Sequence, residues 1–301
     1  MASFTRLVRF IPKSSSDDIN AKSDSDALIG EPVDLEVDVG TAAYETKPVE
    51  VHVYSGLSVL KPGQKTGRKE FVGRLLSPLA QMEVGTIRCV GLNYLNHAKE
   101  VNLPIPDIPT LFMKPSTALA DPYPALTVIP EAFVGDDAAD FESEVALVIG
   151  KAAKNVSEAQ ALDYLLGITA ANDISSRKAQ FAQSQWCYSK SFDGACPLGP
   201  ALVHAAHIRD LAEIRITGTL NGAKVQDSKL DDLIFSIPKI ISFLSQGTTL
   251  QPGTVIITGT PAGVGWSADP KITLHHGDEF RVSVSHGVGT LISRIVEGGR
   301  S

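Results

Sequence analysis

The stretch that decides the fold is FESEVALVIG, residues 141–150. Its run of five apolar residues, 145–149, predicts a central strand that is buried on both faces. Successive side chains of a strand point to opposite faces, so Asp140, Glu142 and Glu144 should project together. Like charges at that spacing repel each other, and burial raises the pKa values of carboxyl groups. The arrangement is therefore costly unless something positive meets these carboxylates.

A hard divalent cation would resolve both the repulsion and the cost of burial. Oxygen ligands suit Mg²⁺, Mn²⁺ or Ca²⁺ and not the softer metals. A third ligand is expected from a neighbouring element, and the candidate is Asp173, which ends the apolar strand in AANDISSRKAQ. Two simpler interpretations stay open. Glu142 and Glu144 could lie on a solvated edge strand, and Asp173 could form an Asx-turn or cap the next helix.

A histidine and a glutamate stand three residues apart in GLNYLNHAKE, residues 91–100. On a helical turn, side chains at this spacing are neighbours. The carboxylate of Glu100 could orient the His97 imidazole and raise its basicity, which is the arrangement used to activate a water molecule. The alternative is an exposed helix start whose polar residues are unrelated.

Two lysines and one glycine-rich turn complete the candidates. Lys114 in LFMKPSTAL and Lys190 in CYSKSFDGACPLGP have apolar neighbours. Such lysines usually extend to the surface, but beside a metal they could hold a substrate carboxylate or supply a proton. TGTPAGVG, residues 258–265, lacks the Gly-Lys-Ser/Thr ending of a nucleotide-binding loop. Its backbone N–H groups could receive an anion such as a carboxylate, or it could be only a tight turn.

The pattern along the chain predicts an α+β protein that is predominantly β. Residues 1–83 are expected to form a small β-rich N-terminal domain with a polar surface segment near 13–26, and residues 84–301 a second domain. The predicted elements are strands at 35–40 and 49–54, a basic turn at 61–70, helices at 155–167 and 237–247, and a closing hairpin at 279–296. Strands outnumber helices, so no βαβ alternation is expected.

Composition limits the class of partner. The chain has 301 residues and a formal net charge of -7, which argues against nucleic acid. No apolar run approaches the roughly 18 residues that span a bilayer. The three cysteines, without a CxxC motif, predict free thiols in a reducing compartment. The chain is therefore predicted to be cytoplasmic, although Arg6 and Arg9 near the N-terminus leave a mitochondrial presequence open.

Six motifs follow one another in a specific order. They are GLNYxxHAxE, FxKPSTAL, the ExE strand before its apolar run, NDxSxRxxQ, KSFDGxCPLGP and TGTPAGVG. This series resembles the fumarylacetoacetate hydrolase family from about Ile87 to the end of the chain. The N-terminal part resembles the smaller, variable leading domain of that family only loosely.

The resemblance implies a mixed β-sandwich roll as the catalytic domain, a homodimer, and one divalent cation, normally Mg²⁺ or Mn²⁺, with Ca²⁺ as a substitute. By motif, it implies a set of roles. Glu142, Glu144 and Asp173 correspond to metal ligands, His97 and Glu100 to the water-activating pair, Arg177, Gln180 and Lys190 to the substrate site, and Thr260 to the contact with the substrate carboxylate. Lys190 is also a predicted proton donor and Lys114 a predicted substrate contact. Asn96 departs from the pattern, since many members carry Asp there.

The resemblance favours a metal-dependent hydrolase that cleaves a C–C bond in a 1,3-diketo acid of the acylpyruvate type. Pyruvate would leave through a metal-stabilised enolate. The intact His97–Glu100 pair favours hydrolysis over the next alternative, decarboxylation of oxaloacetate or another β-keto acid, which needs no activated water. An isomerase of an unsaturated 2-oxo diacid and a bond-forming enzyme of secondary metabolism rank below these. A non-catalytic scaffold would be free to lose one of the three carboxylates, and all three are present.

Overall fold

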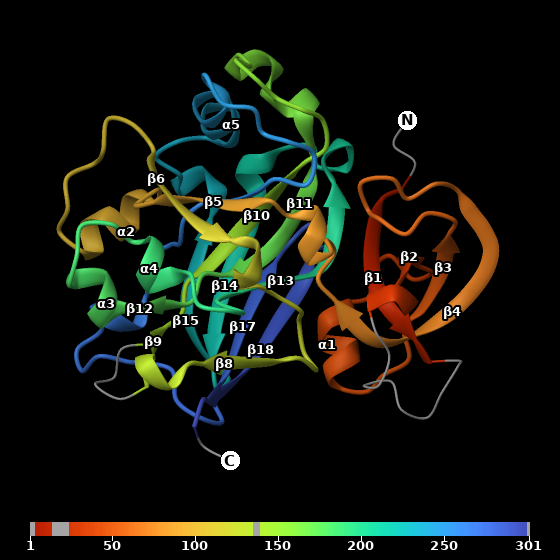
Figure 1. The fold of residues 1–301 in the computed structure, drawn as a ribbon, viewed down its shortest axis with the longest axis horizontal. Coiled ribbons are helices and arrows are strands. Elements are labelled where there is room, and N and C mark those ends of the chain that lie inside the picture. Colours follow the sequence, from red (N-terminus) through yellow and green to blue (C-terminus); the bar gives the residue numbers. More distant parts are fainter. Residues whose placement is uncertain (1–3, 14–23, 135–138, 300–301) are drawn as a thin grey trace.

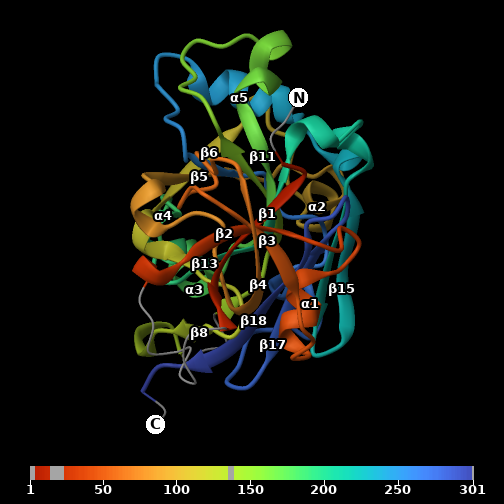
Figure 2. The ribbon, with the colours of Figure 1, turned by 90° about the vertical axis from the view of Figure 1, so that its right-hand side faces the viewer.

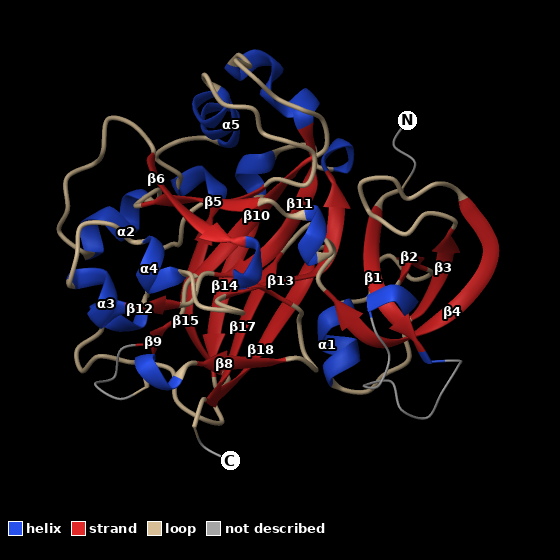
Figure 3. Ribbon diagram, in the orientation of Figure 1, coloured by secondary structure: helices blue, strands red, loops and turns tan. Residues whose placement is uncertain are grey.

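The structure is a computed structural model, and it describes residues 4–13, 24–134 and 139–299. The polar segment predicted near 13–26 lies largely outside the described residues. Strands outnumber helices among the described residues, which confirms a predominantly β architecture of the α+β class (Figure 3). None of the described helices is long and apolar enough to cross a membrane.

The N-terminal strands lie together at one side of the molecule (Figure 1). Their order is β2-β3-β4-β1, and apolar side chains such as Phe10, Val51 and Leu75 form a small core with helix α1. The bounds of these elements are β1 Arg6–Pro12, β2 Leu28–Pro32, α1 Val39–Tyr44, β3 Glu50–Tyr54 and β4 Lys65–Leu76.

These strands continue into the large sheet, because β1 also pairs with β13, where Leu7 stands opposite Leu202. The order after β1 is β13-β11-β10-β16-β5-β6, and the short β7 pairs with β13. The bounds are β5 Thr86–Gly91, β6 Thr110–Pro115, β7 Leu119–Ala120, β10 Ser143–Ile149, β11 Leu165–Asn172, β13 Cys196–His204 and β16 Val255–Ile257. Since the sheet is continuous here, the division at residue 83 stays a prediction.

Strand β10 is central, as its apolar run predicts, with β11 on one side and β16 on the other. Every residue of the strand is buried. Val145, Leu147 and Ile149 belong to the largest hydrophobic core, whereas Ala146 and Val148 face a second core on the opposite side of the sheet. The predicted strand is interrupted, however, since Asp140 belongs to the two-residue strand β9 (Ala139–Asp140), which pairs with β12 (Ser175–Ser176).

A second sheet packs against the largest core and has the order β15-β14-β17-β18-β8 (Figure 2). Phe141, just before β10, stacks on Phe280 of β17 with 4.5 Å between ring centroids. The closing hairpin predicted at 279–296 is confirmed as β17 and β18. The bounds are β8 Leu126–Ile129, β14 Arg215–Leu220, β15 Ala223–Lys229, β17 Glu279–Val284 and β18 Gly289–Glu297.

The helices are short. The helix predicted at 237–247 is confirmed as α5 (Ile237–Ser245), because the Ser236 hydroxyl accepts a hydrogen bond from the Lys239 N–H and Pro238 stands in the first turn. The other helices are α2 Leu95–Glu100, α3 Arg177–Phe181 and α4 Cys187–Lys190. Figure 1 shows these three together on the side of the large sheet away from the N-terminal strands.

Three local predictions are wrong. The helix predicted at 155–167 is a 3-10 helix, Glu158–Tyr164, followed directly by β11. Gly167 does not end a helix; it lies inside β11, where a Cβ would overlap the backbone carbonyl of Val203. The strand predicted at 35–40 is a turn leading into α1, because Asp38 caps that helix by accepting from the Thr41 N–H. The basic turn predicted at 61–70 runs into β4 at Lys65.

Candidate active site

Four chain segments meet at one edge of the large sheet, and the strand directions explain why. Strands β5 and β16 are parallel neighbours, so the segments that follow them leave from the same edge. Helix α2 follows β5, and Gly259 and Thr260 follow β16. Strand β10 runs antiparallel to β16 and therefore begins at this edge, and β11, antiparallel to β10, ends there.

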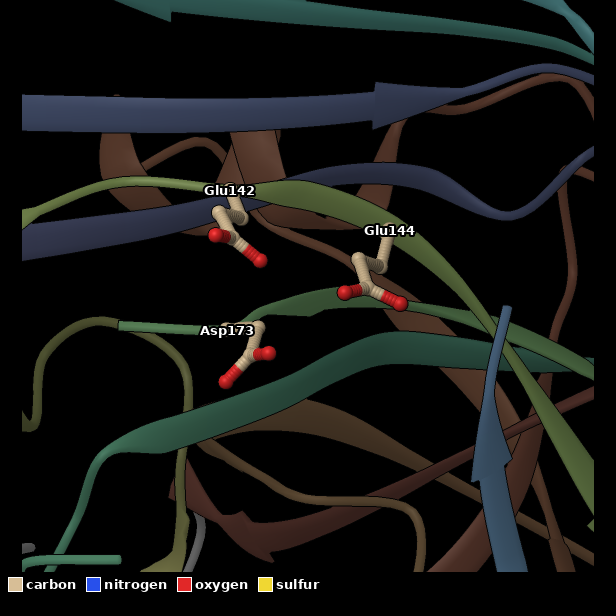
Figure 4. A group of neighbouring side chains, drawn as sticks. All are labelled: Glu142, Glu144 and Asp173. Carbon is tan, nitrogen blue, oxygen red and sulfur yellow. The ribbon is translucent and has the colours of Figure 1, made fainter. Parts of the chain in front are cut away.

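The start of β10 and the end of β11 bring three carboxylates together. Glu142, Glu144 and Asp173 are buried and each offers an oxygen that lies within 4.8 Å of the others. Figure 4 shows the two glutamates extending from one chain segment toward the aspartate on the next. The Asp173 N–H donates to the Glu142 carbonyl at 2.9 Å, which fixes the two segments against each other.

Buried cations hold two of these three carboxylates. The Lys190 ammonium lies 2.8 Å from Glu142 Oε2 and 2.9 Å from Asp173 Oδ2. Arg177 Nη1 lies 2.7 Å from Glu142 Oε1, and Lys114 contacts Asp173 Oδ1. Burial alone would raise the pKa of Glu142, but Lys190 and Arg177 lower it to about 2.

No lysine or arginine of the described residues forms an ion pair with Glu144. The contact that the structure gives its carboxylate is the Gly259 N–H, at 2.5 Å from Oε2. Burial first, and then the charges of Asp173 and Glu142, raise the pKa of Glu144 well above its usual value. An acidic group in this position is poised to accept a further positive charge.

The charge balance of the cluster fits a divalent cation. With Asp140 included, four buried carboxylates face three buried cations: Arg177, Lys190 and Lys114. With all four groups ionised, one negative charge is left over, and the raised pKa of Glu144 shows that its ionised form is the least compensated. A bound dication would leave the cluster with one positive charge, which an anionic substrate could neutralise. Three carboxylates also form the oxygen ligand set that such an ion prefers. The cluster could therefore hold a divalent metal.

The predicted histidine–glutamate pair is formed on α2. His97 Nδ1 and Glu100 Oε2 are 2.8 Å apart, and both side chains are partly buried. The other carboxylate oxygen of Glu100 accepts from the Gly263 N–H at 2.8 Å. The glycine-rich turn thus fixes the glutamate, and the glutamate fixes the imidazole. With Nδ1–H donating to Glu100, Nε2 keeps its lone pair.

A cavity of about 620 Å³ connects these groups. Eight of the predicted site residues line it: His97, Glu100, Glu142, Glu144, Arg177, Gln180, Lys190 and Thr260. Its remaining walls are mostly apolar and aromatic. A separate cavity of about 610 Å³, beside Lys151, His204 and Arg209, contains none of the predicted residues.

The model of the fumarylacetoacetate hydrolase C-terminal domain matches residues 86–296. The chain belongs to this family. It is 42% identical over 300 residues, covering 98% of the chain and 94% of the relative, to a caffeoylpyruvate hydrolase of Neonothopanus nambi. It is 37% identical over 210 residues, 69% of the chain and 65% of the relative, to the mitochondrial oxaloacetate tautomerase FAHD2A of Homo sapiens.

Solved structures of enzymes with related names share the fold of this chain. A 2-hydroxyhepta-2,4-diene-1,7-dioate isomerase from Mycobacterium marinum is 29% identical and superposes with a TM-score of 0.77 over 98% of this chain and 100% of its own. A fumarylacetoacetate hydrolase from Exiguobacterium antarcticum has the same score at 25% identity, over 97% and 99%. The fold is thus that of the fumarylacetoacetate hydrolase family, and these relatives are enzymes.

Two predicted residues do not line the cavity of this fumarylacetoacetate hydrolase family member. Asp173 and Lys114 are fully buried. Asp173 belongs to the carboxylate cluster although its side chain does not form part of the cavity lining. The Lys114 ammonium binds Asp173 and also donates to the Ala195 carbonyl at 2.9 Å. This position favours holding Asp173 over the predicted contact with substrate.

Two further residues of this family member support the site: Gln226, from a segment that the sequence did not connect with it, and Asp140, which the sequence placed beside Glu142 and Glu144 but not among the metal ligands. Gln226 of β15 donates from Nε2 to Thr260 Oγ1 at 2.8 Å, and its Oε1 accepts from the Ser143 N–H at 2.9 Å. Asp140 accepts from Arg177 Nε at 2.9 Å and from the N–H groups of Gly265 and Trp266. No sequence signal marks Gln226, which lies on an edge strand among other polar residues.

Asn96, the departure from the family pattern, faces a carboxylate. Its side-chain Nδ2 donates to Asp232 Oδ1 at 3.0 Å, and its backbone N–H donates to Asp232 Oδ2 at 3.2 Å. The contact joins α2 to the segment after β15. An amide suits this neighbour better than a second carboxylate would.

Proposed function

We propose that the protein hydrolyses an acylpyruvate to pyruvate and a carboxylic acid. The observation that carries the proposal is the His97–Glu100 pair, at 2.8 Å, in the same cavity as Glu142 and Glu144, two of the three clustered carboxylates. Decarboxylation of a 2-oxo acid at a metal would not need an oriented base. The caffeoylpyruvate hydrolase relative, 42% identical over nearly the whole chain, supports the same reaction class.

Glu142, Glu144 and Asp173 are the proposed ligands of Mg²⁺ or Mn²⁺, with Ca²⁺ as a substitute. When bound there, the cation would supply Lewis acidity to the pyruvoyl end of the substrate. Arg177 and Lys190, both buried and ion-paired, keep the carboxylates ionised and in position.

His97 is the proposed general base. Its Nε2 takes a proton from a water molecule while Nδ1–H stays on Glu100, which holds the ring and stabilises the imidazolium. The water oxygen attacks the acyl carbonyl carbon, and the bond from that carbon to the pyruvoyl methylene breaks. The methylene carbon keeps the electron pair and takes a proton to become the methyl group of pyruvate. Lys190, an ammonium on the cavity wall, is the proposed donor, with solvent water as its alternative.

Thr260 and Gln180 are the proposed polar contacts of the substrate. The Thr260 oxygen already accepts from Gln226 Nε2, so its hydroxyl hydrogen is directed elsewhere and can donate to a carboxylate. Gln180 accepts from Arg177 Nη1 at 2.9 Å, which leaves its amide N–H groups for the substrate. Lys114 acts through Asp173 in this proposal, since it lies off the cavity.

The test is pyruvate release from acetylpyruvate and from oxaloacetate, with Mg²⁺, with Mn²⁺ and with a chelator. His97→Ala should lower acetylpyruvate cleavage by about 100- to 10,000-fold, the usual contribution of a general base. Oxaloacetate turnover should persist in that variant. Unchanged acetylpyruvate cleavage in His97→Ala would exclude His97 as the general base. Turnover in the presence of the chelator would exclude a role of the metal in the reaction.

Chemistry on oxaloacetate, by decarboxylation or tautomerisation, is the second candidate, and the oxaloacetate tautomerase relatives favour it. Without acetylpyruvate cleavage, pyruvate release from oxaloacetate would establish decarboxylation, and loss of the enol absorbance of oxaloacetate without pyruvate release would establish tautomerisation. A homodimer and a cytoplasmic location remain predictions. The oxaloacetate tautomerase relative of Homo sapiens is named as mitochondrial, which supports a mitochondrial location as the alternative. Fractionation of cells that express the full chain would distinguish the cytoplasmic from the mitochondrial location.

A further inference from the structure

Four aromatic side chains line the cavity beyond the carboxylates: Phe112, Phe181, Trp186 and Trp266. They form two pairs. Phe112 and Trp186 meet edge to face with 5.6 Å between ring centroids. Phe181 and Trp266 lie 5.6 Å apart with their planes inclined by 34°. Four rings that line one cavity provide far more flat apolar surface than a small 2-oxo acid can cover.

One residue of each pair contacts a side chain that borders the carboxylate cluster. The Lys190 ammonium, which binds Glu142 and Asp173, lies 5.1 Å from the centroid of the Phe112 ring. The backbone N–H of Trp266 donates to Asp140 Oδ2 at 3.0 Å, and Asp140 binds Arg177. Both pairs therefore begin where the reacting end of the substrate is proposed to lie.

The positions of two of these rings point to a ligand. Phe181 lines the cavity and is 67% exposed, so its ring is accessible to a ligand in the cavity. Trp186 lies directly on the backbone of β5 at Gly91, and a Cβ at that position would overlap the indole. Glycine at residue 91 thus makes room for a flat side chain at the cavity wall.

The charges in the cavity argue against a second acidic group on the substrate. Among the described residues, Arg177 and Lys190 are the lysine and arginine side chains that line it, and both are already ion-paired with the cluster. The Lys271 ammonium lies over the Trp266 ring, 3.4 Å from its centroid, but Lys271 is not part of the lining. On the lining itself, a distal carboxylate would meet aromatic faces and no unpaired cation of the described residues. Such desolvation without a partner is costly.

We propose that the two aromatic pairs form a subsite for a planar aromatic acyl group, which makes the substrate an arylacyl pyruvate. The proposal rests on the proposed acylpyruvate hydrolysis and specifies its substrate. Aromatic rings attract one another in offset and edge-to-face arrangements, so a flat ring gains more here than an alkyl chain of similar size.

The first test is selectivity, measured as the ratio of kcat/KM for benzoylpyruvate to that for acetylpyruvate. Wild type should prefer benzoylpyruvate by at least about tenfold and should turn over fumarylpyruvate, which carries the distal carboxylate, poorly. Trp186→Ala and Phe181→Ala should each lower the ratio by roughly 10-fold or more, mainly through KM, and Trp186→Phe should restore part of it. The matched control is Phe71→Ala, an aromatic that is 46% exposed on β4, which should leave the ratio unchanged.

The second test does not need turnover or metal. Trp186 and Trp266 are the two tryptophans of the chain, and both line this cavity, so tryptophan fluorescence reports on it directly. Cinnamate should quench the fluorescence saturably, with weaker apparent affinity in Phe181→Ala, and hexanoate should not quench it. Phe181 is exposed, so this variant should fold even if Trp186→Ala does not.

The outcomes separate the two proposals. Acetylpyruvate cleavage without a preference for benzoylpyruvate, and no quenching by cinnamate, would overturn the aromatic subsite and leave the proposed function standing. Saturable quenching without cleavage of either acylpyruvate would support the subsite and overturn the proposed function. A preference for hexanoylpyruvate over benzoylpyruvate would replace the aromatic group by an alkyl chain.

Discussion

Two regions of the molecule bury charged side chains, and they treat them differently. In the N-terminal strands, buried Glu31 accepts from the Thr5 N–H at 2.7 Å and from Lys65 at 2.5 Å, and Arg6 donates to backbone carbonyls of Val37 and Gly287. In the cavity, Glu144 is equally buried but has the Gly259 N–H in place of a cation. A buried charge with its own partners stabilises a fold, whereas one left short of them is available to a ligand.

The difference between Glu31 and Glu144 can be tested by replacing each of them with glutamine. Glu144→Gln should lower metal-dependent activity on the order of 1000-fold, since Lewis-acid stabilisation is worth several kcal/mol and 1.36 kcal/mol is tenfold in rate. Because burial and the charges of Asp173 and Glu142 already disfavour the ionised form of Glu144, a neutral glutamine should leave the metal-free protein no less stable than wild type. Activity and Tm with and without Mg²⁺ measure both effects. A large fall in the Tm of the metal-free variant would contradict the assignment.

Lys114→Met tests the cation behind the cluster. Breaking a buried ion pair by removing one partner costs about 3–5 kcal/mol, and here it leaves Asp173 with Lys190. A bound dication would compensate part of that charge, so millimolar Mg²⁺ should recover more stability in this variant than in wild type. Urea unfolding in the presence and absence of Mg²⁺ measures the difference. Equal Mg²⁺ effects on both proteins would mean that Lys114 and the cation do not share Asp173.

Glu31→Gln is the counterpart in the N-terminal region. It should destabilise the protein by about 1–3 kcal/mol, because buried groups lose their charged partner, while activity stays unchanged. Burial raises the pKa of Glu31, but Lys65 and the Thr5 N–H lower it below its usual value. Its contribution is therefore present above the unfolded pKa, near 4.3, and is lost as the pH falls through the lower folded value.

The measurement for Glu31→Gln is the urea midpoint of both proteins between about pH 3 and pH 7. The gap between wild type and variant should be constant at the upper end and close at the lower end. A gap that widens as the pH falls would have the wrong sign for a carboxylate with a lowered pKa.

The smallest effect is expected at the surface of α2. Asn96→Asp places a carboxylate opposite Asp232, and exposed charges this close cost no more than about 1 kcal/mol. The variant should shift the His97–Glu100 pair slightly and raise KM less than threefold or so. Asn96→Ala removes the contact without adding charge. Added salt should relieve the first variant but not the second, and the same salt response in both would exclude repulsion.

Local chemistry was predictable from the sequence, and long-range packing was not. Five consecutive apolar residues identified β10, and Ser236 with Pro238 identified α5, because these signals lie within one element. The pairs His97–Glu100 and Glu142–Glu144 were visible for the same reason. The helix predicted at 155–167 failed because Gly167 is required by the approach of Val203 from another strand.

The same distinction holds within the site. Gln226 bonds Ser143 across 83 residues of sequence, and Lys114 bonds Asp173 across 59. Neither relation leaves a pattern in the chain near either residue. Support for a site can therefore be found only once the sheets are packed, even where the reactive groups themselves are evident.

The pairing of β5 with β16 has a consequence for how the protein reaches its working state. The carboxylate cluster spans neighbouring strands, with Glu142 and Asn172 30 residues apart in sequence, whereas Asn93 and Thr258, which join the α2 side to the glycine-rich turn, are separated by 165. Contacts between distant residues form later, because a longer loop must be closed first. During refolding, uptake of the cation should precede the appearance of activity.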